Sequence, residues 1–488
     1  MKDTRNFSIE DLSNSINGKI FGSNDFYFSQ GFTGRFTFLN DAHEGDIVIR
    51  HWINGKGVEI AKDKNIACLI TQDPKEDAIE IAETLNFPLI VTDEIEKANG
   101  FALTWTINTY SHNSQNIAIT GTNGKSTTSH LIYHILKESG FKVFTNTDAE
   151  SEFNTLIDPM VSKLISDEVI SKGELDFLVI EISEVQGWLG SLMKNHSGIM
   201  AKALNPNVGI VTNIAMDHIG LVNSIDEVFD EVSGFVKSLK KGTFVYNADD
   251  ELTSKLLNFK NENVEGFSFG MNSKNNSDVY YDQFKEAIFY KRKKVINKDE
   301  LPFTSNHFIQ NILSAIATCL SLNVPLNDIV NSIKNYKSLK RRFTKLNENP
   351  LIIDDFAHNP DGIKATVSET AKIVPEDNDF YVVCAIRGSR GETINKLNVE
   401  ALVEVFPSNG KLIISSSVDV VNSLNFVEDN EKDIFFKVLD DNNIEFIHFE
   451  KLYDALNETY LKAQKNDVIL LIGAQGMDPA EELLKNIL

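Results

Sequence analysis

The chain has 488 residues, 42% of them hydrophobic and 24% charged, which is the composition of a globular protein with two to four domains. Its formal net charge of −23 argues against nucleic-acid binding through a basic surface field. The sequence shows neither a signal-peptide pattern nor an apolar run long enough to cross a membrane, so we expect a cytoplasmic protein that binds no membrane.

The three cysteines, Cys68, Cys319 and Cys384, lie far apart in the sequence. A zinc ribbon needs closely spaced cysteine pairs, and a disulfide framework of a small secreted domain needs a higher cysteine density. We therefore expect three buried, reduced thiols.

The first part of the chain, residues 1–112, is predicted to be a small α/β domain. The polar stretch at 108–116 is typical of a linker. Short apolar runs at 45–50, 66–70 and 88–93 indicate strands, and residues near 76–85 indicate a helix.

A second domain is predicted at 113–339, because strand and helix patterns alternate from residue 117 onward. Helices are expected at about 307–322 and 326–336, and a hairpin at 278–296 interrupts the alternation. Such alternation is typical of a doubly wound, mostly parallel sheet. The expected strands are 117–120, 142–145, 177–182, 207–214 and 243–247.

The alternation starts again near Arg342 and predicts a third domain at 340–488. Its expected strands are 351–354, 380–386, 411–416 and 468–473. The predicted fold is therefore three α/β domains: a small N-terminal one, a central one with a mostly parallel sheet, and a Rossmann-like C-terminal one.

The stretch GTNGKS at 121–126, between a strand and a helix, predicts a phosphate-binding loop. Its glycines allow successive backbone N–H groups to face a phosphate, and the helix N-terminus adds positive potential. Lys125 would neutralise phosphate charge, and the Ser126 hydroxyl would ligate Mg²⁺. The Walker A pattern has a further glycine at the position of Ile119.

Polar residues also follow the neighbouring strands of this predicted sheet. Glu181 ends the apolar run 177–182, and Asn213, Asp217 and His218 follow the next strand. Each alone could be a solvent-facing or structural group, but the carboxyl ends of parallel strands meet at one sheet edge, where open α/β sheets bind ligands. We expect a metal-assisted nucleotide site there.

These motifs together resemble the Mur ligase superfamily. The resemblance rests on ITGTNGKSTT at 119–128, the strand-end Glu181, and the Thr-Asn and Asp-His pairs at 212–218. It continues in HFIQNILSAIA at 307–317, LKRRFTK at 339–345 and IDDFAHNPDG at 353–362. In this family the phosphate loop lacks the first Walker A glycine, which accounts for Ile119. The N-terminal stretch 39–49 more weakly resembles the precursor-binding domain of the family.

The resemblance implies ATP as cofactor, with two Mg²⁺ ions, and assigns roles to individual residues. Lys125, Glu181, His218 and Arg342 would be catalytic, and Ser126, Glu181 and His218 would be metal ligands. The ATP site would comprise Gly121, Thr122, Asn123, Gly124, Lys125, Ser126, Thr127, Asn311, Arg342, Asp355 and His358.

The sequence departs from the family pattern in several places. Phe308 and Arg341 replace an Asn and a Gly, and no lysine stands in register with the carbamylated lysine of many relatives. Glu231 could supply a metal-binding carboxylate in its place or lie on a solvated helix face. Arg387 and Arg390 follow a strand and would grip an acceptor carboxylate, or lie on a loop surface.

The implied reaction is ATP-dependent formation of an amide bond through an acyl phosphate. The partners would be a UDP-linked peptide or glycopeptide precursor and a free amino acid, acted on by a monomer. The chain resembles the muramyl-tripeptide synthetases but lacks their Asp-Ser-Arg and Asp-Asn-Pro-Arg motifs, which favours a pseudomurein peptide ligase. The alternatives are a ligase similar to folylpolyglutamate or cyanophycin synthetase, or a non-catalytic ATP-binding regulator.

Overall fold

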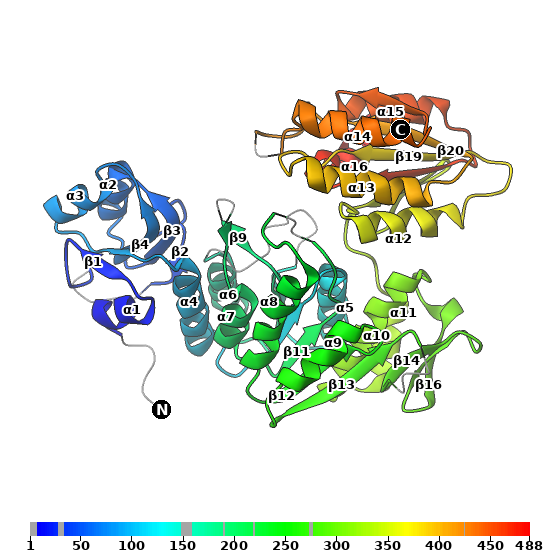
Figure 1. Ribbon diagram of the computed structural model, residues 1–488. Coiled ribbons are helices and arrows are strands. Elements are labelled where there is room, and N and C mark those ends of the chain that lie inside the picture. The colour runs from blue at the N-terminus through cyan, green and yellow to red at the C-terminus, as the bar shows by residue number, and fades with distance from the viewer. Residues whose placement is uncertain are drawn as a thin grey trace. The chain divides into compact units, whose positions relative to one another are not determined.

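A computed structural model describes residues 7–27, 34–147, 159–188, 191–217, 220–272, 277–423 and 425–488. The chain divides into two compact units, residues 1–336 and 337–488. The first unit holds two large sheets and the second holds one (Figure 1). None of the helices in the described ranges is long and apolar enough to span a bilayer.

The N-terminal sheet has five strands in the order β1-β5-β4-β3-β2, all parallel except β1. Helices α1 and α4 cover one face of this sheet, and α2 and α3 cover the other. The strands are β1 Lys19–Phe21, β2 Phe36–Thr37, β3 Ile47–Ile53, β4 Cys68–Pro74 and β5 Leu89–Val91; the helices are α1 Ile9–Ser15, α2 Gly55–Asp63, α3 Ala78–Thr84 and α4 Ile95–Tyr110.

The linker predicted at 108–116 is mostly wrong. Helix α4 continues to Tyr110, and the first strand of the central sheet begins at Gln115. The helix keeps its last polar residues because it packs along its length: Gly100 lies against Ile199 of a central-domain helix, and the Tyr110 ring contacts Trp105 at 6.0 Å between centroids. Tertiary packing therefore overrides the local polar composition.

The central sheet has nine strands in the order β16-β15-β14-β13-β12-β11-β6-β8-β7. From β6 the chain first builds towards β7 and β8 and then returns to build from β11 outwards, so the strand order reverses beside β6. Ligands of open α/β sheets bind at such reversals. Successive side chains of β6 point to opposite faces of the sheet. Ile117 and Ile119 lie on the face that α5, α10 and α11 cover, and Ala118 lies on the face that α4, α6, α7 and α8 cover.

The predicted hairpin is a three-stranded antiparallel segment, and β13 was missed by the sequence prediction. The strands are β6 Gln115–Thr120, β7 Val143–Thr145, β8 Phe177–Glu181, β11 Val208–Val211, β12 Gly242–Asn247, β13 Val264–Gly270, β14 Val279–Asp282, β15 Ala287–Tyr290 and β16 Lys293–Asn297, with a small ribbon of β9 Gly187–Trp188 and β10 Ser191–Leu192. The helices are α5 Lys125–Glu138, α6 Met160–Lys172, α7 His196–Leu204, α8 Ile225–Ser238, α9 Glu251–Lys255, α10 Asn306–Ser321 and α11 Leu326–Lys334.

The second unit is one sheet in the order β17-β18-β22-β19-β20-β21, parallel apart from β17. Helices α12, α13 and α14 cover one face, and α15 and α16 cover the other. The strands are β17 Thr344–Glu348, β18 Leu351–Asp355, β19 Phe380–Ala385, β20 Gly410–Ser415, β21 Phe446–Phe449 and β22 Val468–Ile472; the helices are α12 Pro360–Ala371, α13 Glu392–Val405, α14 Asp429–Asp441, α15 Leu452–Lys462 and α16 Ala480–Lys485.

Candidate active site

The phosphate loop joins β6 to α5, as the sequence predicts. Gly121 and Gly124 have φ angles of 120° and 82°, which L side chains rarely adopt. A Cβ at Gly121 would lie 2.4 Å from Thr212 Oγ1, and one at Gly124 would lie 2.3 Å from Asn311 Oδ1. Conformation and space therefore both require glycine at these two positions.

The end of β11 fixes the backbone of this loop. The Asn123 amide donates to Asn213 Oδ1 at 2.9 Å, and Asn213 Nδ2 donates to the Asn123 carbonyl at 2.8 Å. The Thr122 hydroxyl bridges the carbonyl and amide of Ala215 at 3.1 and 3.0 Å. The Thr-Asn pair that follows β11 thus works as a brace for the loop.

Lys125, at the start of α5, lies in a cluster of carboxylates. Its Nζ donates to Glu184 Oε2 at 2.8 Å, and the Glu184 side chain is 1% exposed. Burial acts to lower the pKa of Lys125, but the carboxylates of Glu184, Glu181 and Asp217 outweigh it and raise the pKa. The lysine therefore stays charged. Sequence reasoning missed Glu184, although the spacing of Glu181 and Glu184 at the end of a buried strand was visible.

Ser126 and Glu181 are brought together as predicted, with Ser126 Oγ donating to Glu181 Oε1 at 3.1 Å. The backbone of Glu181 is held by Asn146, whose Oδ1 accepts from the Glu181 amide at 2.8 Å and whose Nδ2 donates to its carbonyl at 3.0 Å. A hydroxyl and a carboxylate are the hard oxygen donors that Mg²⁺ prefers, so this pair fits a divalent cation.

Ile119 lies in β6, where it pairs with Glu181 of β8 and is fully buried. The loop proper begins at Gly121. The residue that departs from the Walker A pattern is therefore a core residue of the strand.

Three further residues that the sequence analysis singled out in this domain, Thr127, Phe308 and Asn311, are buried. Thr127 is buried on α5, and Phe308 packs on Phe303 with 4.6 Å between ring centroids. Asn311 is buried on α10, where its Oδ1 lies 3.5 Å from Thr128 Oγ1. Its contact with adenine stays a prediction.

The other two predicted metal ligands are Glu231 and His218, and their roles stay predictions. The Glu231 carboxylate accepts from the Asn195 amide at 2.6 Å, at the N-terminus of α7, and burial raises its pKa. His218 lies outside the described residues. Within the described ranges, no group of three or more His, Cys, Asp or Glu side chains is arranged to hold a metal ion.

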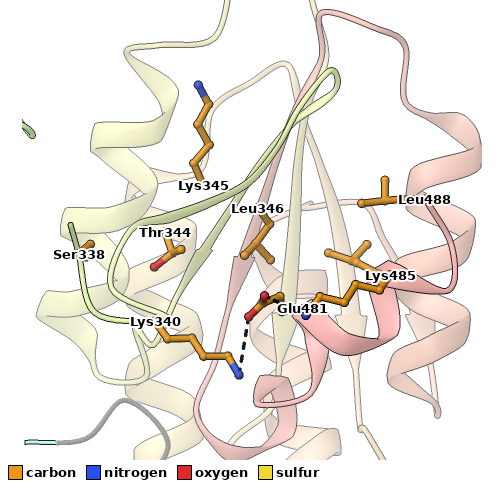
Figure 2. A pocket seen from close by; sticks show the side chains of 9 residues that line it. Ser338, Lys340, Thr344, Lys345, Leu346, Glu481, Lys485 and Leu488 are labelled. Atoms are coloured by element: carbon orange, nitrogen blue, oxygen red, sulfur yellow. Dashed lines mark ion pairs between the residues drawn. The ribbon is translucent and has the colours of Figure 1, made fainter.

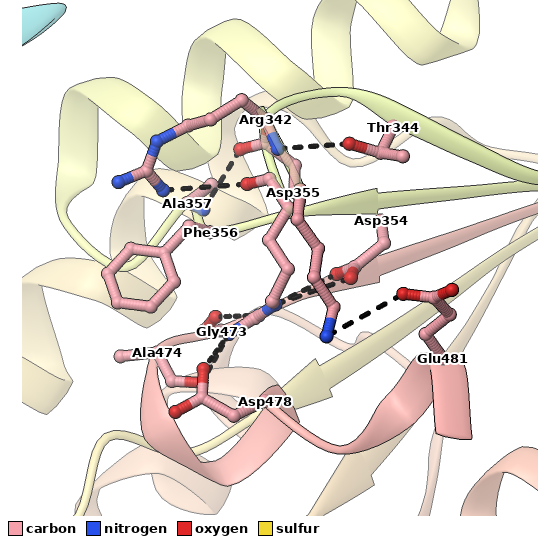
Figure 3. Close-up of polar contacts among 12 residues, drawn as sticks. Arg342, Thr344, Asp354, Asp355, Phe356, Ala357, Gly473, Ala474, Asp478 and Glu481 are labelled. Carbon is pink, nitrogen blue, oxygen red and sulfur yellow. Dashed lines mark hydrogen bonds and ion pairs between the residues drawn. The ribbon is translucent and has the colours of Figure 1, made fainter. Parts of the chain in front are cut away.

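In the second unit, Asp355 ends β18 and lies near Arg342 and Phe356 (Figure 3), and His358 follows three residues after Asp355. The Arg342 guanidinium lies 4.6 Å from the Phe356 ring centroid, and the His358 ring meets that of Phe356 edge-on at 5.0 Å. The Asp355 carboxylate accepts from the amides of Phe343 and Ala357 at 2.7 and 2.9 Å. Asp355 therefore fixes the local backbone; its contact with ribose stays a prediction.

Arg341 occupies the position of the family glycine, and its φ of 59° explains why glycine is usual there. The side chain is 2% exposed, with Nε 3.3 Å from both Asp354 oxygens and NH1 paired with Asp478. NH1 also donates to the Ala474 carbonyl at 3.1 Å. The arginine thus ties the segment before β17 to the segment after β22, where Figure 3 labels its partners Ala474 and Asp478.

Arg387 and Arg390 lie in the loop between β19 and α13. Glu431 of α14 holds this loop: its Oε1 accepts from the Arg390 amide at 2.8 Å and its Oε2 from the Ser389 amide at 3.0 Å. Glu431 is 1% exposed. No sequence pattern points to Glu431, because it stands 41 residues after Arg390 on an acidic helix.

A pocket of the second unit lies beside β17 and α16 (Figure 2). Arg342, Asp355 and His358 are not among the residues that line it. Its Lys340 and Lys485 are paired with Glu481 at 3.7 and 3.2 Å, and Lys345 with Glu348 at 2.6 Å. No predicted site residue lines it. The lining residues are Ser338, Lys340, Thr344, Lys345, Leu346, Glu481, Leu484, Lys485 and Leu488.

Comparisons with known proteins place the chain in a family. The Mur ligase middle domain matches residues 119–319, and the Mur ligase, glutamate ligase domain matches residues 341–475. UDP-N-acetylmuramate–L-alanine ligase of Clostridium acetobutylicum is 25% identical over 372 residues, which cover 74% of this chain and 73% of that enzyme.

Solved structures agree on the fold. MurF from Acinetobacter baumannii has a TM-score of 0.68 at 17% identity, covering 99% of this chain and 98% of that one. A pseudomurein peptide ligase type C from Methanothermus fervidus has a TM-score of 0.58 at 20% identity, covering 91% and 95%. Both matched domains carry the motifs described above, and the chain belongs to the Mur ligase family of ATP-dependent, ADP-forming acid–amino-acid ligases.

Proposed function

We propose that this protein uses ATP to join a free amino acid to a carboxylate of a UDP-linked cell-wall peptide or glycopeptide precursor. The observation that carries the proposal is the phosphate loop, in which a buried charged lysine stands beside a serine hydroxyl and a strand-end carboxylate, Ser126 Oγ and Glu181 Oε1 being 3.1 Å apart. This is the equipment for handling a phosphoryl group.

The proposed reaction has two chemical steps. A carboxylate oxygen of the precursor attacks the γ-phosphorus of ATP, the bond to the β-phosphate oxygen breaks, and ADP leaves. The neutral amine of the amino acid then attacks the acyl carbon, phosphate departs with the original carboxylate oxygen, and the amine loses a proton to give the amide.

The residues of the chain would act by position and charge. Lys125 would hold the β- and γ-phosphates, and the amides of residues 121–126 would donate to phosphate oxygens. Ser126 and Glu181 would hold a Mg²⁺ ion, which supplies charge neutralisation for the phosphates. We propose a second ion near His218, with Glu231 as a less well-placed ligand.

On the second unit, Arg342, Asp355 and His358 would contact the nucleotide, as Asn311 would from the first. Arg387 and Arg390 would bind the carboxylate of the incoming amino acid. The fixed backbone of their loop supports this assignment, because the amides of Ser389 and Arg390 are held by one buried carboxylate. We also propose that the protein is cytoplasmic, because ATP and UDP-linked precursors are cytoplasmic substrates. We further propose that it acts as a monomer.

The acceptor we propose is a pseudomurein-type precursor. The missing bacterial motifs support it, and so does the fold likeness to a pseudomurein peptide ligase. The activity of the related Clostridium acetobutylicum enzyme favours instead UDP-N-acetylmuramate with L-alanine. These two acceptors define the arms of the test.

The test measures ADP release with ATP and Mg²⁺ in the presence of single substrates and of pairs. One arm uses UDP-N-acetylmuramate with L-alanine, and the other uses UDP-linked glutamyl peptides with each common amino acid. ADP formation only when acceptor and amino acid are both present is the expected result, with the peptide arm the faster. Stimulation by the muramate pair alone would overturn the pseudomurein assignment, and stimulation by neither would overturn the proposed reaction.

A further inference from the structure

The Lys125 ammonium group makes three hydrogen bonds. Besides Glu184 Oε2 at 2.8 Å, Nζ donates to the carbonyls of Gly121 and Thr122 at 2.8 and 3.0 Å. An ammonium group carries three N–H donors, and all three are used. A phosphate oxygen that binds Lys125 must therefore displace one of these three acceptors.

The two carbonyls are poor candidates for displacement. They belong to the loop whose backbone is braced by the end of β11, where the Thr122 amide donates to the Asn213 carbonyl at 3.0 Å. The Asn123 carbonyl accepts from Thr212 Oγ1 at 2.7 Å, which fixes the next peptide. Moving either carbonyl would break this brace. Glu184 is held through a side chain with three rotatable bonds, in the segment after β8, so its carboxylate is the group that can move.

The charges around Lys125 also indicate that Glu184 is the group that a phosphate displaces. Three carboxylates, those of Glu184, Glu181 and Asp217, act on the one lysine. A nucleotide phosphate entering this cluster meets net negative charge, and Glu184 is the carboxylate in direct contact with the lysine. Displaced into a buried, anionic surrounding, the Glu184 carboxylate needs a cation beside it.

We propose that Glu184 is a positioning residue that occupies Lys125 until a nucleotide phosphate replaces it, and that this exchange makes nucleotide binding depend on a divalent cation. The proposal rests on the proposed function, in that ATP and ADP bind at this loop.

The experiment measures ADP affinity by isothermal titration calorimetry, with Mg²⁺ and with EDTA, for the full-length protein. The quantity compared is the ratio of the two dissociation constants. In the Glu184→Gln variant the metal-free affinity rises, because one negative charge near the phosphates is removed, and the ratio falls by about tenfold or more. Glu184→Asp keeps the charge and restores most of the ratio.

The matched control is Glu168→Gln, which removes a carboxylate from the ion pair with Lys172 on the surface of α6 and leaves the ratio unchanged. Thermal unfolding of each variant checks the fold; Glu181 and Asp217 still compensate Lys125 in Glu184→Gln. A ratio equal to that of the unmodified protein in a folded Glu184→Gln variant would overturn the inference alone. If the unmodified protein binds no ADP under either condition, the inference and the proposed nucleotide site both fail.

Discussion

Gly124 in the phosphate loop and Arg341 before β17 both have left-handed backbone conformations, with φ of 82° and 59°. At Gly124 a Cβ would clash with Asn311 Oδ1 at 2.3 Å, so the loop has no room for a side chain. At Arg341 the side chain is buried against Asp354 and Asp478. At Arg341 the backbone conformation alone favours glycine, and a residue with strong partners replaces it. At Gly124 the Asn311 side chain also favours glycine.

The difference has a functional meaning. The phosphate loop is held in place by hydrogen bonds of its own backbone and by the contacts of Lys125. The segment around Arg341 is filled by its own side chains and serves to fix Arg342 and Asp355. The first region should therefore be sensitive in activity, and the second mainly in stability.

The largest effect is expected at Lys125. Lys125→Ala removes the phosphate-binding charge and should lower kcat by about 10²- to 10³-fold. It also leaves Glu184 buried without its cation, so we include Lys125→Ala with Glu184→Gln as the control for folding. Steady-state ADP release and thermal unfolding check this. Full activity in the folded double variant would refute the phosphate-loop assignment.

The largest effect on stability is expected from the loss of the buried ion pair at Arg341. Arg341→Ala leaves Asp354 buried and unpaired and should reduce the free energy of unfolding by about 3–5 kcal/mol. Arg341→Gly loses the same contacts but relieves the backbone strain, so it should lose about 1 kcal/mol less. Urea unfolding measures both. Equal stabilities for the two variants would mean that the positive φ costs nothing at this position.

Gly124→Ala tests the steric requirement for glycine in the phosphate loop. Strain and the clash with Asn311 together should lower the free energy of unfolding by about 2–4 kcal/mol and weaken ADP binding. Gly140 is the matched control, because its φ is 90° and no atom lies within 4 Å of its Cβ position. Gly140→Ala should cost only the strain, about 1 kcal/mol. Similar costs for both variants would contradict the steric argument.

The smallest expected effect is an opposite pH response of the two units. Burial lowers the pKa of His196 to about 4, so the folded first unit binds fewer protons and loses stability as pH falls below 6.5. Burial, against the opposing pull of Arg341, raises the pKa of Asp354 to about 6. The second unit therefore loses stability as pH rises from 3.8 to about 6.

Two variants separate these two pH dependences, each of which corresponds to about 3 kcal/mol of stability. His196→Leu should flatten the decline between pH 6.5 and 4, and Asp354→Asn should remove the decline between pH 3.8 and 6. Urea unfolding at five pH values, followed by fluorescence and by proteolysis of each unit, measures them. A His196→Leu curve parallel to that of the unmodified protein would contradict the assignment.

The sequence predicted what depends on short-range chemistry. The strand, turn and helix around Lys125 were visible because glycine and a Gly-Lys-Ser-Thr run leave few alternatives, and Glu181 was visible as a charge at the end of an apolar strand. The alternation of strands and helices predicted the three α/β sheets. Strands β13 and β17 were missed because polar and charged residues interrupt their apolar positions, and β21 was missed because it has only four residues.

The partners of these residues could not be predicted. Asn146 and Glu431 act through long-range contacts that only the strand order brings together, and the sequence shows the spacing of Glu184 but not its contact with Lys125. Arg341 was visible as a departure from the family pattern, but its compensation by Asp354 and Asp478 depends on β18 and β22 being neighbours. The end of α4 was predicted wrongly because packing outweighs composition there.

The proposed acyl phosphate can be tested most directly by isotope transfer. The accepted UDP-linked precursor is prepared with ¹⁸O in both carboxylate oxygens and is turned over with ATP and the amino acid, and the products are analysed by mass spectrometry. The account predicts one ¹⁸O atom in the released phosphate and one in the amide, with none in the nucleotide. Unlabelled phosphate, or label in AMP, would contradict it.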